Sequence, residues 1–231
     1  MLNLLHATLH RPERGWDPVP CSHVTAYAAY ATETFDRNVV PMLEAKLGSL
    51  AGRRVLDLGG GPGNYSIEFC RHGAKVFWHD VSRRYMDLAR ANAEDAGVAV
   101  EFSLGYLEQA RSLLDGEFDL VFCRVCWYYC MDDRRFAGML YSLIKPGGAG
   151  YIECNTPAFA NAKGLRRLQY FFSDRLWLKL GHPYPPHGRV ENLVRRFPIS
   201  HIDVDYSSVY IDRIFFLKAQ GRPTNGGVAC G

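Results

Sequence analysis

The chain has 231 residues, of which 48% are hydrophobic and 22% charged, and a formal net charge of +3. This composition excludes a disordered chain, and the small net charge argues against a general polyanion binder. No apolar run approaches the roughly 20 residues that a transmembrane segment needs. Histidine and arginine interrupt the apolar start, which excludes a signal-peptide core. We therefore expect a cytoplasmic protein.

The N-terminal segment, residues 1–50, is expected to be helical, because apolar and aromatic residues recur at helical spacing up to Gly48. Beyond it, apolar runs bounded by glycine alternate with amphipathic runs that predict helices. Five strands separated by helices imply parallel βαβ units with right-handed crossovers. The predicted strands are residues 55–58, 74–80, 98–105, 118–125 and 148–155.

Two further strand-like runs, residues 199–206 and 209–219, are separated by only two serines. So short a connection excludes a parallel crossover and predicts an antiparallel hairpin at one edge of the sheet. Residues 220–231 are expected to be a flexible tail. The predicted fold is a single domain over residues 1–219. It is a doubly wound, mostly parallel seven-stranded α/β sheet with an antiparallel C-terminal hairpin.

Residues 156–198 do not fit this alternation, and we expect them to form a helical cap between strands five and six. Within this cap, residues 163–196 carry eight Lys or Arg against two acids, a net charge of +6. The basic, aromatic helix expected at 165–180 is one candidate for resting on a membrane surface. Its charges do not segregate onto one face, which argues against that interpretation.

Three of the seven cysteines, Cys123, Cys126 and Cys130, have the spacing C-x2-C-x3-C. No second pair of ligands follows at the usual spacing, so we predict no metal site. We interpret these three as small hydrophobic residues at a strand end and the start of the next helix. An odd number of cysteines also suits a reducing compartment better than secretion.

A glycine loop with the pattern D-x-G-x-G-x-G follows the first strand, formed by Asp57, Gly59, Gly61 and Gly63. Small residues there let the backbone approach a ligand at the switch point of the sheet. The dinucleotide pattern G-x-G-x-x-G fails, because its third glycine would fall on asparagine or serine, and no P-loop G-K-[ST] follows. The loop therefore predicts a ligand-binding turn that belongs to neither of these two motifs.

Asp80 ends the second strand, 21 residues after Gly59. A carboxylate in this place can accept hydrogen bonds from both hydroxyls of an adenosine ribose. The alternatives are that Asp80 is a helix cap and that the glycines form a turn without a ligand. Ser82 already suits the role of helix cap. Each alternative is plausible by itself, but the predicted topology argues against both holding at once.

The segments VLDLGGGPGN, HDVS, FDLVFCRV and LIKPGGAGYIE occur in this order within residues 53–155. In order and spacing this region resembles the class I S-adenosylmethionine-dependent methyltransferases. The resemblance implies a Rossmann-like fold, S-adenosyl-L-methionine as the cofactor and a glycine loop along its methionine portion. It further implies ribose contacts from Asp80 with Val81, adenine contacts from Tyr106 with Leu107, and a backbone contact from Arg124.

The chain departs from the family pattern at two places. Gly105-Tyr106 stands after the third strand, where many members have an acid. Tyr106 stacking beside adenine and Tyr106 as a packing aromatic both stay open. The [DNS]-P-P-[YFW] signature of enzymes that methylate nucleic-acid amino groups is absent after the fourth strand. We therefore expect no DNA substrate.

The acceptor has to lie in line with the methyl group, with water excluded. An aromatic surround suits the vanishing sulfonium charge, and Trp127, Tyr128 and Tyr129 are expected there, although at least one should belong to the core. We expect Tyr128 and Tyr129 to contact the acceptor. A hydroxyl or ammonium acceptor needs a base, for which His187 in the cap loop is the candidate, whereas a carboxylate acceptor needs none.

The positive charge of the cap predicts an acceptor with a carboxylate or phosphate, although solvated helix faces are commonly basic as well. Arginine matches such groups with two hydrogen bonds. The predicted acceptor-binding arginines are Arg166, Arg167 and Arg189.

These observations predict methyl transfer to an oxygen or nitrogen of a small, anionic or aromatic metabolite in a biosynthetic pathway. Two alternatives stay open: a methyltransferase that acts on RNA or protein, and a non-catalytic partner subunit that binds the cofactor. We find no additional recognition domain of the kind that macromolecular enzymes carry. The glycine loop and the strand-two acid are both intact, which argues against an inactive subunit.

Overall fold

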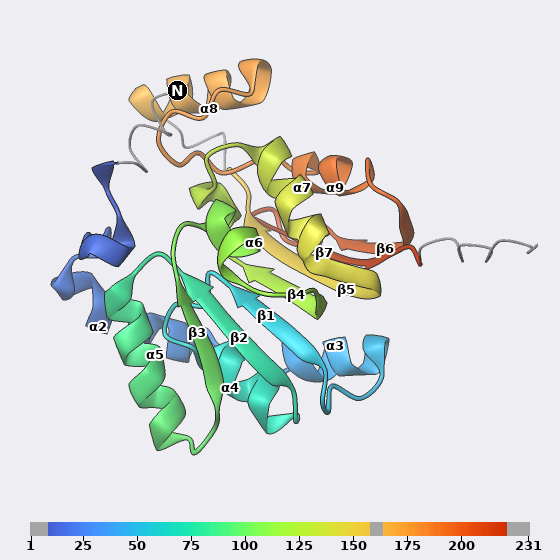
Figure 1. Ribbon diagram of the computed structural model, residues 1–231. Coiled ribbons are helices and arrows are strands. Elements are labelled where there is room, and N and C mark those ends of the chain that lie inside the picture. Colours follow the sequence, from blue (N-terminus) through green and yellow to red (C-terminus); the bar gives the residue numbers. More distant parts are fainter. Residues whose placement is uncertain (1–8, 158–163, 221–231) are drawn as a thin grey trace, which may run out of the picture.

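The computed structural model describes residues 9–157 and 164–220. Its centre is a seven-stranded sheet in the order β3-β2-β1-β4-β5-β7-β6 (Figure 1). Strands β1 to β5 pair in parallel, whereas β7 is antiparallel to both β5 and β6. The prediction of a mostly parallel sheet with an antiparallel C-terminal hairpin is thus confirmed. The strands are β1 (Arg54–Leu58), β2 (Lys75–Asp80), β3 (Val100–Leu104), β4 (Phe118–Arg124), β5 (Ile144–Asn155), β6 (Ile199–Asp205) and β7 (Ile211–Lys218).

Helices cover both faces of the sheet, with α6, α7 and α9 on one face and α3 and α4 on the other (Figure 1). The principal helices are α2 (Cys21–Glu33), α3 (Val39–Leu47), α4 (Asn64–Arg71), α5 (Arg83–Asp95), α6 (Ala110–Leu113), α7 (Asp133–Leu143), α8 (Leu165–Leu176) and α9 (Arg189–Val194). Short 3-10 helices are η1 (Pro12–Arg14), η2 (Leu107–Gln109) and η3 (Trp127–Tyr129).

The central strand β4 supplies apolar side chains to two separate cores. Val121 and Cys123 belong to the core under α7 and α9, whereas Leu120 and Phe122 belong to the core under α3 and α4. All four side chains are fully buried. This alternation between faces is the period-two pattern of a strand covered on both sides, and it fixes the register of the strand ends at which the site lies.

Local hydrogen bonds explain two differences from the predicted elements. The N-terminal segment forms two helices rather than one, since residues 34–38 interrupt it and Asp36 accepts the backbone N–H of Asn38. The hairpin link is residues 206–210 instead of two serines, because Asp205 accepts the N–H of Ser207 and bends the chain early. Aspartate commonly competes with regular structure in this way.

The described part of the cap lies at the end of the sheet where β5 terminates, with α8 farthest from the strands (Figure 1). The helix expected at 165–180 ends at Leu176. Expectations for residues 158–163 and for the tail at 221–231 lie outside the described residues. Within 9–157 and 164–220, none of the helices combines the length and apolar character that crossing a bilayer requires.

Candidate functional site: a ligand crevice at the strand ends

The candidate site lies where β1, β2 and β4 end. Strands β1 and β4 are neighbours in the sheet. From β1 the chain continues to β2 and β3 on one side, and from β4 it continues to β5 on the other, so a crevice opens between the segments that follow β1 and β4. The segment after β1 is the glycine loop, and the segment after β4 leads into η3. Three loops therefore meet at one edge of the sheet.

The glycine loop is shaped by two neighbouring side chains. Gly59 has a φ of +80°, and a Cβ there would lie 2.6 Å from the Cβ of Cys126. Gly61 has a φ of +49°, and a Cβ there would meet only Tyr27, at 3.6 Å. The carbonyl oxygen of Gly61 accepts a 3.1 Å hydrogen bond from the indole N–H of Trp78. Glycine is therefore required at position 59 for both space and backbone conformation, and at position 61 for backbone conformation.

Asp57 supports this loop from below. Its carboxyl group is buried and accepts a 2.6 Å hydrogen bond from the hydroxyl of Ser66. Burial raises the pKa of Asp57 to about 6. This value includes the lowering effect of the Ser66 hydrogen bond and a smaller raising effect of the nearby Asp80. Since it bonds to α4, Asp57 is placed to hold the loop against that helix.

Asp80 connects the glycine loop with the start of α5. One carboxyl oxygen accepts the N–H of Gly61 at 3.1 Å, and the other accepts the N–H of Ser82 at 2.9 Å. Burial raises the pKa of Asp80 to about 6, although three backbone N–H groups oppose that shift. Capping of α5 falls to Ser82, whose hydroxyl accepts the N–H of Tyr85. A carboxylate offers about four acceptor positions, so at least one stays free for a ligand hydroxyl.

The segment after β3 faces the N-terminal segment. The hydroxyl of Tyr106 donates to the carbonyl oxygen of His10 at 2.7 Å, and the Tyr106 ring stacks on Trp16 with centroids 6.0 Å apart. Leu107 is buried beside the glycine loop, and Val81 is half-buried. A role of Tyr106 beside adenine stays a prediction, because its stacking partner here is Trp16.

The end of β4 carries a strained turn. Val125 has a φ of +55°, which is costly for a β-branched residue. Its N–H donates to the carbonyl oxygen of Glu153 at 2.6 Å, and the Arg124 guanidinium lies 3.1 Å from the Glu153 carboxylate. The Arg124 side chain is therefore paired with β5, and its predicted backbone contact with the cofactor stays a prediction.

Residues 55–148 match a family model described as a methyltransferase domain. In this region the chain is similar to the class I S-adenosylmethionine-dependent methyltransferases, as its motifs predicted. The cofactor expected from that similarity is S-adenosyl-L-methionine. The residues present fit it, because Asp80 keeps acceptor capacity for a ribose hydroxyl and the glycine loop admits close approach of a ligand to its backbone.

The similar proteins agree with this assignment. The chain is 34% identical over 101 residues to a ubiquinone biosynthesis O-methyltransferase of Bordetella avium, a match that covers 44% of this chain and 42% of the relative. The chain thus spans less than half the length of that curated relative.

Two solved structures share the fold. An O-methyltransferase family protein from Burkholderia thailandensis has a TM-score of 0.61 and 24% identity, covering 86% of this chain and 60% of that one. Magnesium protoporphyrin IX methyltransferase from Synechocystis, with bound SAH, has a TM-score of 0.57 and 21% identity, covering 79% and 80%. At these identities the likeness shows the fold alone.

The aromatic residues after β4 divide between core and surface. Trp127 is fully buried and donates from its indole N–H to Asp133 at 3.1 Å, so one of the three aromatics belongs to the core, as expected. Tyr129 is 53% exposed, and Tyr128 packs edge-on against Tyr184 of the cap loop. The two tyrosines are therefore available at the crevice, as their predicted acceptor contacts require.

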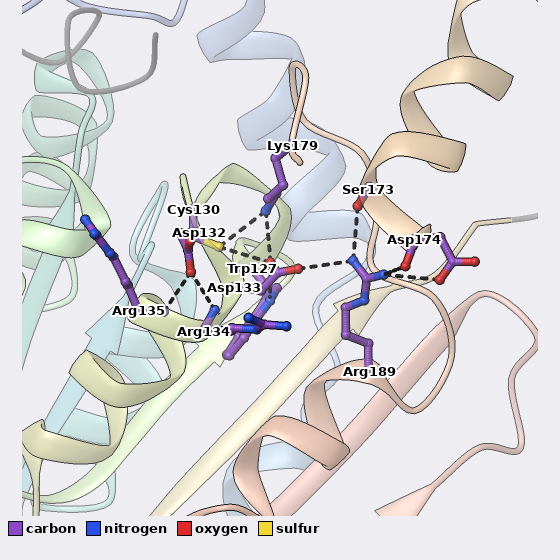
Figure 2. Close-up of polar contacts among 10 residues, drawn as sticks. All are labelled: Trp127, Cys130, Asp132, Asp133, Arg134, Arg135, Ser173, Asp174, Lys179 and Arg189. Atoms are coloured by element: carbon purple, nitrogen blue, oxygen red, sulfur yellow. Dashed lines mark hydrogen bonds and ion pairs between the residues drawn. The ribbon is translucent and has the colours of Figure 1, made fainter. Parts of the chain in front are cut away.

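The cap is held in place by a buried ion-pair network (Figure 2). Asp133, at the start of α7, accepts from Lys179 at 3.1 Å and lies 3.4 Å from the guanidinium of Arg189. Arg189 also donates to Ser173 and Asp174 of α8. Because Arg189 is only 7% exposed, its guanidinium is occupied by internal partners rather than directed at a ligand.

Arg166 and Arg167, by contrast, are exposed on α8. Lys179 and Arg189, two of the eight basic residues counted in the sequence, both pair with Asp133, which lies outside residues 163–196 and lowers the net charge of this region from +6 to +5. The pairs of Arg189 with Asp174 and of Arg195 with Glu191 involve acids that the count of +6 already includes. The argument for an anionic acceptor now depends on the exposed arginines of α8.

His187 lies over the start of β7. Its Nδ1 is 2.6 Å from the buried carboxylate of Asp212, and its Nε2 is 2.9 Å from the carbonyl oxygen of Val209 and 3.1 Å from the hydroxyl of Thr156. Both ring nitrogens thus face acceptors, so this arrangement does not present a free nitrogen for proton abstraction. The base role of His187 stays a prediction.

Two residues near the crevice were not among the predicted site residues. Asp17 bonds to the start of α5, and Tyr27 lies against the glycine loop. Tyr27 is visible in the sequence only as one member of a helical repeat, and no local pattern marks Asp17, because it meets its partner through tertiary structure. His182 is recognisable in the sequence as a second histidine of the cap loop, and its ring lies 5.2 Å from the Tyr129 ring.

Proposed function

We propose that this protein transfers the methyl group of S-adenosyl-L-methionine to an oxygen or nitrogen atom of a small metabolite in a biosynthetic pathway. The observation that carries the proposal is the glycine loop joined to Asp80 by the Gly61 hydrogen bond at the switch point of the sheet. The curated relatives are named O-methyltransferases, which supports oxygen as the acceptor atom.

When bound, the cofactor supplies an electrophilic methyl group, so the residues of this chain position the partners rather than generate a reactive species. Asp80 would accept the ribose hydroxyls, and the glycine loop would lie along the methionine portion. Tyr128 and Tyr129 would line the acceptor side, and the cap fastened through Asp133 would limit access of water.

A hydroxyl acceptor must lose a proton, and the cap loop offers two histidines. His182 is exposed and contacts Tyr129, whereas both ring nitrogens of His187 face acceptors. Its contact with Tyr129, which is predicted to lie beside the acceptor, makes His182 a second candidate for the proton acceptor alongside His187. Loss of a general base commonly lowers kcat by about 10²-fold or more. We expect that loss, with a changed pH–rate profile, for whichever of His182→Ala and His187→Asn removes the base, and an unchanged profile for the other variant.

The proposal is tested by incubating the purified protein with cofactor labelled in its methyl group and with separate pools of small metabolites, RNA and protein. We expect label to pass only into the small-metabolite pool. Transfer to RNA or protein would replace the proposal with the macromolecular alternative. Tight binding of the cofactor without transfer to any pool would favour a non-catalytic subunit. Where transfer is found, the identified acceptor serves in the kinetic comparison of the two histidine variants.

A further inference from the structure

The N-terminal segment crosses the strand-end edge in front of the glycine loop, although helix α2 buries none of its own residues. Its attachment is polar. The Asp17 carboxylate accepts the hydroxyl of Ser82 and the N–H of Arg84, both at 2.9 Å, and Arg84 donates to the carbonyl oxygen of Val19 at 2.7 Å. The segment is thus anchored to the start of α5, directly after the ribose-binding Asp80.

Two aromatic residues of the N-terminal segment, Trp16 and Tyr27, flank the anchoring Asp17 in the sequence. One contacts the segment after β3 and the other lies against the glycine loop. Trp16 stacks on Tyr106, in the segment that follows β3. Tyr27 lies against the glycine loop, where its ring edge is 3.6 Å from the position that a Cβ of Gly61 would take. The Tyr27 ring also packs against Tyr85 of α5, with centroids 5.5 Å apart.

The Tyr27 hydroxyl lies among groups from three other elements. Burial raises the pKa of Tyr27 to about 12, with smaller raising effects from Tyr129 and Asp80 and a lowering effect from Arg124 already included in that value. The phenol therefore stays neutral and keeps its proton as a hydrogen-bond donor. At the same time 41% of the residue is exposed, so part of its surface is open to a ligand.

We propose that Tyr27 is a cofactor-binding residue, which closes the outer side of the glycine loop and offers its hydroxyl and ring to the methionine portion. This inference rests on the proposed function, because the ligand is the same cofactor. A purely structural role explains the geometry less well, since a helix without buried residues gains little stability from the sheet beneath it. The contacts of the segment are instead gathered at the ligand crevice.

The test is the affinity for S-adenosylmethionine and S-adenosylhomocysteine, measured by calorimetry, which requires no acceptor. We expect Tyr27→Ala to weaken binding tenfold or more, because it removes both ring and hydroxyl. Tyr27→Phe keeps the ring and should weaken binding about two- to tenfold, the value of one hydrogen bond. Tyr30→Ala is the matched control, since Tyr30 is 59% exposed on the same helix; it should change affinity less than twofold.

Thermal unfolding without ligand separates binding from folding, and we expect the midpoints of Tyr27→Phe and wild type to agree. If wild type binds both compounds and the two Tyr27 variants bind equally well, the inference is wrong and the proposed function stands. If wild type binds neither compound, the proposed function fails and the inference fails with it.

Discussion

At the scale of single residues, the site contains two carboxyl groups that are costly to ionise. Burial raises the pKa of Asp57 and of Asp80 to about 6 each, and the two groups repel one another. Both pKa values lie above those expected in the unfolded chain. The stability that these groups contribute is therefore full below about pH 4 and is lost as the pH rises through about 6. The site thus trades stability for an ionised acceptor.

This trade predicts the pH dependence of cofactor binding. A neutral Asp80 loses acceptor capacity, so we expect the Kd for S-adenosylhomocysteine to rise about tenfold for each pH unit below about 6. Asp80→Asn should bind weakly with a nearly flat profile, and its thermal midpoint at pH 7.5 should exceed that of wild type. Calorimetry between pH 5 and 8 measures the first effect, and thermal unfolding measures the second.

Glu101→Gln is the control, since Glu101 is an exposed acid on β3. Its profile should match that of wild type. A wild-type Kd that stays constant down to pH 5 would show that ionised Asp80 does not contact the ligand.

At the scale of elements, the cap is held in two ways: α9 packs Val190, Leu193 and Val194 into the apolar core, whereas α8 and the cap loop are joined to the fold by charges. Asp133 of α7 receives Lys179 from the cap loop and Arg189 from α9, and Arg189 reaches α8 through Asp174. Removing one member of such a network leaves a buried charge uncompensated, which is strongly destabilising. The three arginines predicted to bind the acceptor therefore divide into one internal and two exposed residues.

We expect Arg189→Gln to lower the free energy of unfolding by about 3 kcal/mol, measured by urea denaturation. Arg166→Gln and Arg167→Gln are the matched controls and should stay within about 0.5 kcal/mol of wild type. With an anionic acceptor, these two variants should raise its KM while cofactor affinity stays constant. An Arg189→Gln protein as stable as wild type would show that the network does not hold the cap.

The elements also show which features a sequence can predict. The glycine loop and Asp80 lie at fixed spacing after strands whose burial is evident from their composition, so the local pattern was sufficient. Arg189 depends on Asp133, 56 residues earlier in the chain, and its role follows only from their tertiary contact. The hairpin link likewise differs because Asp205 turns the backbone, a competition that strand propensity does not encode.

At the scale of the molecule, the ligand crevice lies at the strand ends between two cores that share β4. A ligand that bridges β1, β2 and β4 should therefore stabilise the whole fold. At 100 times its Kd, such a ligand adds about 2.7 kcal/mol. We expect S-adenosylhomocysteine to raise the thermal midpoint by about 5–10 °C, and NAD to leave it unchanged. A midpoint raised by NAD alone would contradict the cofactor assignment.

The packing of Cys126 beneath the glycine loop has a practical consequence. Its Sγ lies 3.1 Å from the carbonyl oxygen of Leu58 and directly against Gly59, whereas Cys21 is exposed. The hydrogen bond with Cys123 and burial raise the pKa of the Cys126 thiol, so an alkylating reagent reacts there only after the loop lifts from the strand. When labelling of the peptide that contains Cys126 is followed by mass spectrometry, its rate therefore measures how often the glycine loop opens, and no substrate is needed.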